Sequence, residues 1–337
     1  MSEGGRMQRR EFITLVGGAA ALAPFAVRAQ QPERVRVIGM LMNAEPTDPE
    51  IQRRVSGLRE GLKALGWIEG KNLYIEARWG AGDADGVRTY ARELVQLAPE
   101  VIFTNGTPST AAVKRETSSI PVVFAIVADP VGDGFVASLS RPAGNITGFS
   151  SFDSDIGGKW AELLKEIAPG VTRAALLFNP RTVPGGGTGL MRPVFDAAAR
   201  KLGVTPQAMP VGSAVDIERS LAAYAGAAAG LVVMPDGFLL VNTELVIRLA
   251  NELRLPTVYP FRQFVGRGGL ISYGVDSVDL NRRAATYLDR VLRGANPADL
   301  PIQTPTKFEL AINLKTAKAL GLTIPLPLQA AADEVIE

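Results

Sequence analysis

Short apolar runs alternate with amphipathic segments along the chain from Arg34 onward. The first run, residues 35–43, predicts a buried strand that ends in an asparagine. An amphipathic helix is expected over residues 49–65, closed by Gly66 as a C-cap. The alternation then predicts helices at 85–97 and 108–117 between the strands "NLYIEARW", "VIFTN" and "PVVFAIV". Such an order is typical of βαβ units and a parallel sheet.

The second half of the chain repeats this order. "TRAALLFNP", from Thr172, predicts a strand that ends at Asn179, and the helix after it runs to Leu202 and is closed by Gly203. The strands "AGLVVMPDG" and "LPTVYP" follow, with a helix expected over residues 242–253 between them. We therefore predict an α/β protein of two similar, Rossmann-like lobes.

The chain is expected to cross between these lobes three times, which leaves them free to open and close. The first crossing is "SLSRPAGNITGFSSFD", where Pro and Gly break the helical pattern. The helix at 279–292 follows "GGLISYG" and is expected to return to the first lobe, and "LPIQTPTKFELAIN" would cross again. The amphipathic segment 326–337 could pack on the second lobe. The predicted division is an export signal at 1–29, a first lobe of 34–148 plus 275–298, and a second lobe of 149–270 plus 303–337.

The N-terminal segment has the features of an export signal. Arg9 and Arg10 precede an apolar stretch at 12–27, an arrangement that resembles a twin-arginine signal. The stretch is short for a membrane span, and "VRA" predicts cleavage after Ala29. No cysteine follows, so we expect an exported, soluble periplasmic protein without a lipid anchor. A membrane anchor or amphipathic helix is the alternative, and either Met1 or Met7 could be the start.

Composition narrows the function classes. The 337 residues suit two compact units, and a net charge of +2 without a Lys/Arg run argues against nucleic-acid binding. The absence of Cys and His excludes disulfides, thiolate or His-ligated metals and a Ser-His-Asp triad. Neither a P-loop nor a calcium loop is complete. We therefore expect no catalytic residue, no metal and no cofactor, although Asp, Glu, Lys, Ser and Tyr could still catalyse.

Candidate ligand residues lie at the carboxyl ends of the predicted strands, where open α/β sheets bind ligands. The turn Gly106–Ser109 is the main one, because a helix N-terminus exposes unpaired N–H groups and a partial positive charge to an anion. Aromatic rings could stack on an apolar part of the ligand, and Asp236 or Asp129 could pair with an amino group. Asp129 could equally initiate a turn, and Tyr259 could be a core ring. The full set is Asn43, Gly106, Thr107, Pro108, Ser109, Asp129, Phe152, Asn179, Asp236, Phe238 and Tyr259.

Several stretches of the chain together resemble one family. They are "NGTPST", "DPVGDGFVASLSRPAGNITGFS", "GGKWAELLKEIAPGVTRAALLFNP", "YPFRQF", "GGLISYG" and "PTKFELAINLKTAKALGLTIP". They are similar to the ABC-transporter substrate-binding proteins related to tryptophan- and aromatic-amino-acid-binding receptors, over essentially the whole mature chain. The resemblance implies a type I periplasmic-binding-protein fold, a monomer, and delivery of a small solute to the membrane subunits of an ABC permease. It also implies carboxylate binding by Thr107, Pro108 and Ser109, but it does not carry over the identity of the solute.

The energy that the Gly106–Ser109 turn can contribute to binding indicates what else the ligand must offer. A helix N-terminus stabilises an anion by about 0.3–1 kcal/mol, whereas micromolar affinity requires about 8 kcal/mol. Burial of an apolar part of the solute between closing lobes must supply much of the difference. We therefore expect an amino acid or an aromatic or branched acid. The alternatives are a ligand sensor for a membrane signalling protein, or an exported enzyme that uses Asp236 or Asp129 with Lys159 or Tyr273.

Overall fold

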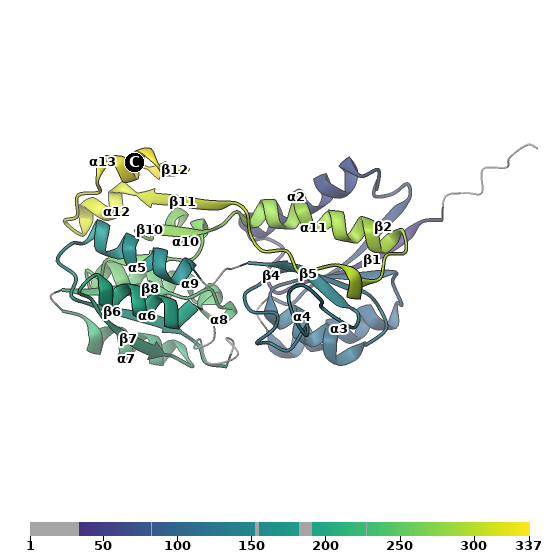
Figure 1. Cartoon of the computed structure of the whole chain (residues 1–337), viewed down its shortest axis with the longest axis horizontal. Coiled ribbons are helices and arrows are strands. Elements are labelled where there is room, and N and C mark those ends of the chain that lie inside the picture. Colours follow the sequence, from purple (N-terminus) through teal and green to yellow (C-terminus); the bar gives the residue numbers. More distant parts are fainter. Residues whose placement is uncertain (1–33, 82, 152–154, 182–190, 227) are drawn as a thin grey trace, which may run out of the picture. The chain divides into compact units, whose positions relative to one another are not determined.

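The computed structural model describes residues 34–81, 83–151, 155–181, 191–226 and 228–337, and Figure 1 shows their arrangement. These residues form a five-stranded sheet and a seven-stranded sheet, each with its own helices. The two α/β lobes predicted from the alternation of apolar and amphipathic segments are thus confirmed. The export signal expected at 1–29 lies outside the described residues.

The first sheet is entirely parallel, in the order β2-β1-β3-β4-β5. Met42 pairs with Asn105, and Asn105 pairs with Ala125, so neighbouring strands end level at one edge. Loops that follow these strands are therefore brought together at that edge. The strands are β1 (Arg36–Met42), β2 (Leu73–Trp79), β3 (Val101–Asn105), β4 (Val122–Val127) and β5 (Ile146–Ser150).

Helices cover both faces of this sheet, because successive strand residues point to opposite sides. Met40 and Met42 join the core under α2 (Pro49–Ala64), whereas Leu41 joins the core under α3 (Ala84–Gln96) and α4 (Thr107–Glu116). The helix α11 (Ser277–Leu292) lies beside α2 (Figure 1), and a Cβ on Gly61 would lie 2.5 Å from the Arg282 carbonyl oxygen. This late helix therefore packs against a helix of the first lobe.

The second sheet has the order β12-β11-β10-β9-β8-β6-β7, parallel except where β10 meets β11. Its last strands come from the C-terminal segment, and β12 pairs with β11, as the expected packing of residues 326–337 on this lobe requires. The strands are β6 (Arg173–Phe178), β7 (Thr205–Pro210), β8 (Ala229–Val233), β9 (Thr257–Tyr259), β10 (Ile271–Val275), β11 (Phe308–Asn313) and β12 (Glu334–Ile336).

The helices of the second lobe enclose its core. Trp160 of α5 is fully buried and its indole N–H donates to the Tyr273 carbonyl oxygen of β10 at 2.8 Å. This bond anchors α5 to the sheet. The helices are α5 (Ile156–Ile167), α6 (Met191–Lys201), α7 (Ala214–Tyr224), α8 (Gly237–Val241), α9 (Thr243–Glu252), α10 (Arg262–Gly266), α12 (Leu314–Ala319) and α13 (Leu326–Ala330); the 3₁₀ turn η2 (Pro297–Asp299) precedes β11.

The chain passes between the sheets after β5, between β10 and α11, and before β11. The third of these segments lies along β5, because the Ser150 N–H donates to the Gln303 carbonyl oxygen at 2.9 Å and the Gln303 N–H donates to the Gly148 carbonyl oxygen at 3.0 Å. The hinge with three crossings is therefore present as expected, and the segment at Gln303 is hydrogen-bonded to β5.

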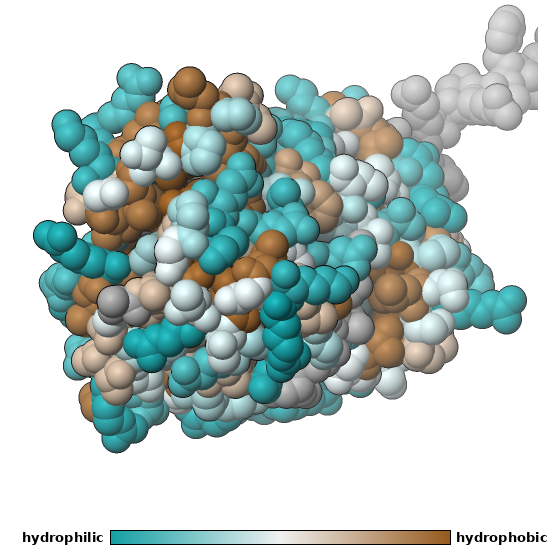
Figure 2. Space-filling view, turned by 60° about the vertical axis from the view of Figure 1, so that its left-hand side comes forward, coloured by the Kyte–Doolittle hydropathy of each residue, from teal (hydrophilic) through white to brown (hydrophobic). Residues whose placement is uncertain are grey.

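Hydrophobic and hydrophilic residues are interspersed on the face shown in Figure 2. Large hydrophobic side chains that stay exposed are distributed along the chain instead of filling one element, which is normal for a folded domain. Among the described residues they are Val35, Ile68, Tyr74, Leu97, Val131, Leu139, Val215, Val241, Leu326 and Val335.

Candidate functional site

The N-terminus of α4 directly follows the edge at which β3 ends. Gly106 is its N-cap residue, with a φ of +90° that favours glycine, and it supplies no side chain to cap the helix. Pro108 stands in the first turn, where its lack of an N–H group costs nothing. No side chain among the described residues caps this turn. The first turn of α4 therefore keeps its ability to bind an anion.

Two neighbouring hydroxyl groups of this turn differ in their bonding. Thr110 is buried and its hydroxyl lies 2.8 Å from that of Thr104 and donates to the Gly106 carbonyl oxygen at 3.0 Å. Ser109 is also fully buried, but its hydroxyl has no hydrogen-bond partner among the described residues. Buried polar groups are nearly always satisfied, so this hydroxyl distinguishes the turn from an ordinary helix start.

Asp133 adds a carboxyl group next to the turn, and the sequence reasoning missed it. The Thr107 hydroxyl donates to Asp133 Oδ2 at 3.2 Å, while Oδ1 is buried without a partner among the described residues. Burial raises the pKa of Asp133 to about 7, opposed by the Thr107 bond and reinforced by the charge of Asp129. Asp133 is therefore partly protonated near neutral pH. Its place four residues after Asp129, in the loop that follows a strand, was the available signal.

Asp129 mainly shapes its own loop. Its Oδ1 accepts the Gly132 N–H at 2.8 Å, and a Cβ on Gly132 would lie 2.2 Å from Oδ2. This is the turn-initiating role that the sequence also suggested for an aspartate before proline. Its expected contact with the ligand stays a prediction.

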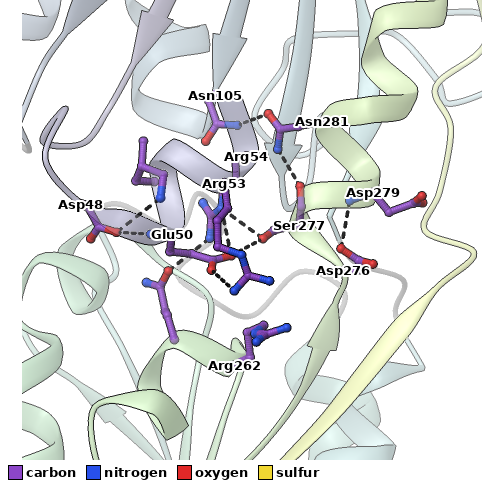
Figure 3. Close-up of polar contacts among 12 residues, drawn as sticks. Asp48, Glu50, Arg53, Arg54, Asn105, Arg262, Asp276, Ser277, Asp279 and Asn281 are labelled. Carbon is purple, nitrogen blue, oxygen red and sulfur yellow. Dashed lines mark hydrogen bonds and ion pairs between the residues drawn. The ribbon is translucent and has the colours of Figure 1, made fainter. Parts of the chain in front are cut away.

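Asn105, the last residue of β3, is held by α11. Its Nδ2 donates to Asn281 Oδ1 at 2.9 Å, and Asn281 Nδ2 donates to the Ser277 carbonyl oxygen at 2.7 Å (Figure 3). Asn105 is 5% exposed and Asn281 is fully buried. The pair therefore ties the residue before the α4 turn to the N-terminal part of α11.

A buried charge cluster continues from Ser277 into α2 (Figure 3). Arg54 Nε donates to the Ser277 hydroxyl at 3.1 Å, and that hydroxyl donates to Glu50 Oε1 at 2.9 Å. Arg54 is 3% exposed, and its burial lowers the pKa of the guanidinium, opposed by the charges of Glu50 and Asp48. Arg54 Nη2 also donates to Gln263 Oε1 of α10 at 3.3 Å. Arg54 thus joins the first lobe to the second.

In the second lobe, Asp236 and Asn179 bind backbone groups. Asp236 Oδ2 accepts the Asn179 N–H at 2.8 Å and Oδ1 accepts the Leu239 N–H at 2.7 Å, which makes Asp236 the N-cap of α8. Asn179 Oδ1 accepts the Arg181 N–H at 2.9 Å. These bonds give Asp236 a structural role and offer no support for its expected pairing with an amino group, which stays a prediction.

Predicted site residues from both lobes meet at the start of α8. A Cβ on Gly237 would lie 3.5 Å from Asn43 Nδ2 and 3.6 Å from Pro108 Cγ. Phe238, the next residue, is half-buried. The structure thus brings Asn43, the α4 turn and the α8 N-terminus together.

Two other aromatic residues predicted to contact the ligand, Tyr259 and Phe152, are not placed by the structure beside Asn43 and the α4 turn. Tyr259 is 1% exposed, and its ring stacks on Phe264 with centroids 5.0 Å apart. The ring is therefore part of the second-lobe core, the alternative stated for it from sequence, and its expected contact with the ligand gains no support. Phe152 lies outside the described residues.

Neither a metal centre nor a membrane span emerges from the described part of the chain. No three Asp, Glu, His or Cys side chains among these residues are placed to hold a metal ion. No helix in the same residues has the length and apolar character needed to cross a bilayer.

Comparisons with known proteins agree with this architecture. A curated relative, the tyrosine-binding protein of Clostridioides difficile (strain R20291), is 26% identical over 274 residues, which cover 81% of this chain and 78% of the relative. A crystal structure of a conserved domain protein from Vibrio cholerae is 29% identical, with a TM-score of 0.81, 90% of this chain covered and 100% of the other. The ABC domain of Streptococcus pneumoniae in complex with L-Trp is 26% identical, with a TM-score of 0.82 and the same coverage.

The fold is that of the type I periplasmic binding proteins, with a parallel-stranded α/β lobe on either side of the hinge. The model of the family described as "ABC transporter substrate binding protein" matches residues 46–336, which is most of the chain. This protein therefore belongs to the ABC transporter substrate-binding protein family.

Proposed function

We propose that the protein binds an amino acid, with tyrosine and tryptophan as the first candidates, between its lobes and delivers it to the membrane subunits of an ABC importer. The observation that carries this proposal is the first turn of α4, which has no capping side chain and holds the buried hydroxyl of Ser109. The family is one of substrate-binding proteins rather than of enzymes. Two relatives are named or crystallised with an aromatic amino acid, which supports the ligand class.

In this proposal the solute's carboxylate lies at Thr107, Pro108 and Ser109. The α4 N-terminus contributes at most about 2 kcal/mol of the roughly 8 kcal/mol that micromolar binding requires. The solute's apolar side chain must supply much of the remainder when it leaves water. Phe238 is half-buried and directly follows Gly237, whose added Cβ would lie 3.6 Å from Pro108 Cγ, so we expect its ring to contribute to the apolar part of the site. A solute that combines a carboxylate with an apolar group fits both parts.

We also propose that the protein is exported to the periplasm and works there as a monomer, with lobes at 34–148 plus 275–298 and 149–270 plus 303–337. Arg9, Arg10 and the apolar stretch after them support export, with cleavage after Ala29. N-terminal sequencing of the protein from a periplasmic extract tests this. The expected mature terminus is Gln30, and the change of both arginines to lysine should retain the precursor in the cytoplasm. A mature protein that still carries Met1 or Met7 would contradict the export signal.

A thermal-shift screen tests the solute class. The mature chain is refolded to remove co-purified solute and mixed with amino acids, aromatic acids, branched acids and neutral sugars. We expect aromatic amino acids to raise the melting temperature, and Thr107→Ala or Ser109→Ala to reduce the shift at the same ligand concentration. Thr286→Ala, on the exposed face of α11, is the matched control and should keep the full shift. Stabilisation by sugars alone, or by carboxylates regardless of Thr107 and Ser109, would contradict the proposal.

A further inference from the structure

The hydrogen bonds around Asn105 determine which end of its side-chain amide is the oxygen and which is the nitrogen. The Ser277 carbonyl oxygen can only accept, so the Asn281 atom that reaches it at 2.7 Å is the Nδ2 donor. The other end of the Asn281 amide, its oxygen, therefore faces Asn105. An oxygen there requires a donor, and Asn105 Nδ2 supplies it at 2.9 Å. As a result, Asn105 Oδ1 points away from Asn281 (Figure 3).

The residues that impose this orientation, Asn281 and Ser277, are buried and are held in place by hydrogen bonds. Asn281 is fully buried, and Ser277 is 4% exposed. The Ser277 hydroxyl is bonded to both Arg54 and Glu50, which keeps the first turn of α11 against α2. Reversal of the Asn105 amide would place its oxygen against the Asn281 oxygen in this interior, which is costly.

Asn105 Oδ1 is an acceptor beside the anion-binding turn. Asn105 directly precedes Gly106, the N-cap of α4, and no donor among the described residues reaches its Oδ1. Alternation along β3 puts Asn105 on the same side of the strand as Phe103, toward α2 and α11, whereas Thr104 points to the α4 side. The carboxyl end of β3 therefore presents an acceptor next to a group of N–H donors.

We propose that Asn105 is a specificity-determining residue that accepts a hydrogen bond from the solute's ammonium group, while the α4 turn binds the solute's carboxylate. This rests on the proposed function and deepens it. In an α-amino acid the two groups are bonded to one carbon, so they need an acceptor and an anion site side by side. Asp236 and Asp129 already accept backbone N–H groups. Asp133 Oδ2 accepts the Thr107 hydroxyl, but Oδ1 has no partner among the described residues, so Asp133 is the competing acceptor, and an unchanged ratio in Asn105→Leu would assign the ammonium group to it. The site is therefore selective for α-amino acids over the carboxylic acids that lack the amino group.

Isothermal titration with two ligand pairs tests this. The pairs are L-tryptophan with indole-3-propionate, and L-tyrosine with 3-(4-hydroxyphenyl)propionate. A hydrogen bond to a charged group corresponds to a preference of about 10- to 100-fold for the amino acid in the wild-type protein. Asn105→Leu should bring this ratio close to one, mainly through weaker binding of the amino acid. Asn105→Asp should raise the ratio, because a carboxylate favours the ammonium and repels the desamino anion.

A second variant tests the positioning role of Asn281. Asn281→Leu removes the bond that orients Asn105 and should lower the ratio by less than Asn105→Leu does, because the freed amide can still turn toward the ligand. Asn145→Leu is the matched control. Asn145 donates to the Ile120 carbonyl oxygen at 2.7 Å in the same lobe, and its loss should affect stability but leave the ratio unchanged.

The outcomes separate this inference from the proposed function. A wild-type protein that binds neither pair contradicts the proposed function itself. A wild-type protein that binds the desamino acids as tightly as the amino acids, or a ratio that is the same in Asn105→Leu and wild type, overturns the role of Asn105 alone. If Asn105→Leu does not fold, Asn105→Asp decides, and an unchanged ratio in that variant overturns the inference.

Discussion

Asp48 Oδ2 accepts an ion-paired hydrogen bond from Arg267 Nη2 at 2.8 Å, which joins the two lobes. Asp48 is the N-cap of α2 in the first lobe, and Arg267 directly follows α10 in the second. The Arg54–Gln263 bond lies between the same two helices. Contacts of this kind form or break when the lobes move relative to each other, so they contribute to the equilibrium between open and closed forms.

Arg267→Ala tests the Asp48 contact. Both side chains are partly exposed, so the pair is worth about 0–1 kcal/mol, and we expect solute affinity to fall by no more than about fivefold. The difference from wild type should shrink in 0.5 M salt, since salt screens such pairs. Titration calorimetry at two salt concentrations measures both effects. Arg219→Ala is the control, because Arg219 pairs with Asp216 within α7. An equal loss in the control would argue against a cross-lobe role.

We expect Arg54→Met to lower the free energy of unfolding much more than Arg53→Met does. Arg54→Met leaves Glu50, which is 8% exposed, without its buried cationic neighbour, and losses of about 3–5 kcal/mol are typical of such broken pairs. Arg53→Met removes an exposed pair with the same Glu50 and should cost about 1 kcal/mol or less. Urea denaturation of both variants gives the two free energies of unfolding. Equal losses would show that Arg54 does not stabilise this interior.

Asp133 predicts a pH dependence of stability. Its pKa is raised to about 7 in the folded protein, so the folded state keeps a proton that the unfolded chain releases near pH 4. The contribution of this group to stability therefore falls as the pH rises from about 4 to about 7. Asp133→Asn removes the effect and should stabilise the protein at pH 8 by about 1–2 kcal/mol, a value reduced for partial solvent screening, but not at pH 4. Thermal melts at the two pH values measure it.

The control variant for the Asp133 experiment is Asp216→Asn, and its expected effect on stability at pH 8 has the opposite sign. The Ser213 hydroxyl and the Gly212 N–H bind Asp216 and lower its pKa. Asp216→Asn should therefore destabilise the protein at pH 8 and lose this effect in acid below the normal aspartate range. If Asp133→Asn destabilises at pH 8, as Asp216→Asn is expected to do, Asp133 is stabilised as an anion and our assignment fails.

Gly237 provides a steric test of the approach between the lobes. An alanine Cβ would make ordinary contacts with Asn43 and Pro108, at 3.5 and 3.6 Å, so Gly237→Ala should change solute affinity by no more than about threefold. Gly237→Leu adds three further carbon atoms beside Asn43 and Pro108 and should weaken binding more than about tenfold without unfolding either lobe. Gly170→Leu, at an exposed glycine whose Cβ would meet nothing within 4 Å, is the control. Unchanged binding by Gly237→Leu would place the solute elsewhere.

Much of the secondary structure is decided locally and was readable from the sequence. The alternation of apolar runs predicted the strands of the first sheet, and Gly106 with Pro108 marked the start of α4 within a few residues of chain. The strand β7 was missed, because half of its residues face solvent at the sheet edge and Pro206 and Pro210 lie within it. Edge strands lack the continuous apolar run that identifies a buried strand.

The polar side chains of the site were decided by tertiary structure. Asn105 and Asn281 are 176 residues apart, and Arg54 and Ser277 are 223 apart; they meet because α11 returns to pack on α2. Asp236 was identified as a loop carboxylate, but only the fold shows that backbone N–H groups occupy both its oxygens. The sequence by itself determined the lobes and the uncapped turn that starts α4, because strands, caps and turns depend on near neighbours. Partners for buried polar groups depend on which distant segments pack together, and that was fixed only by the folded chain.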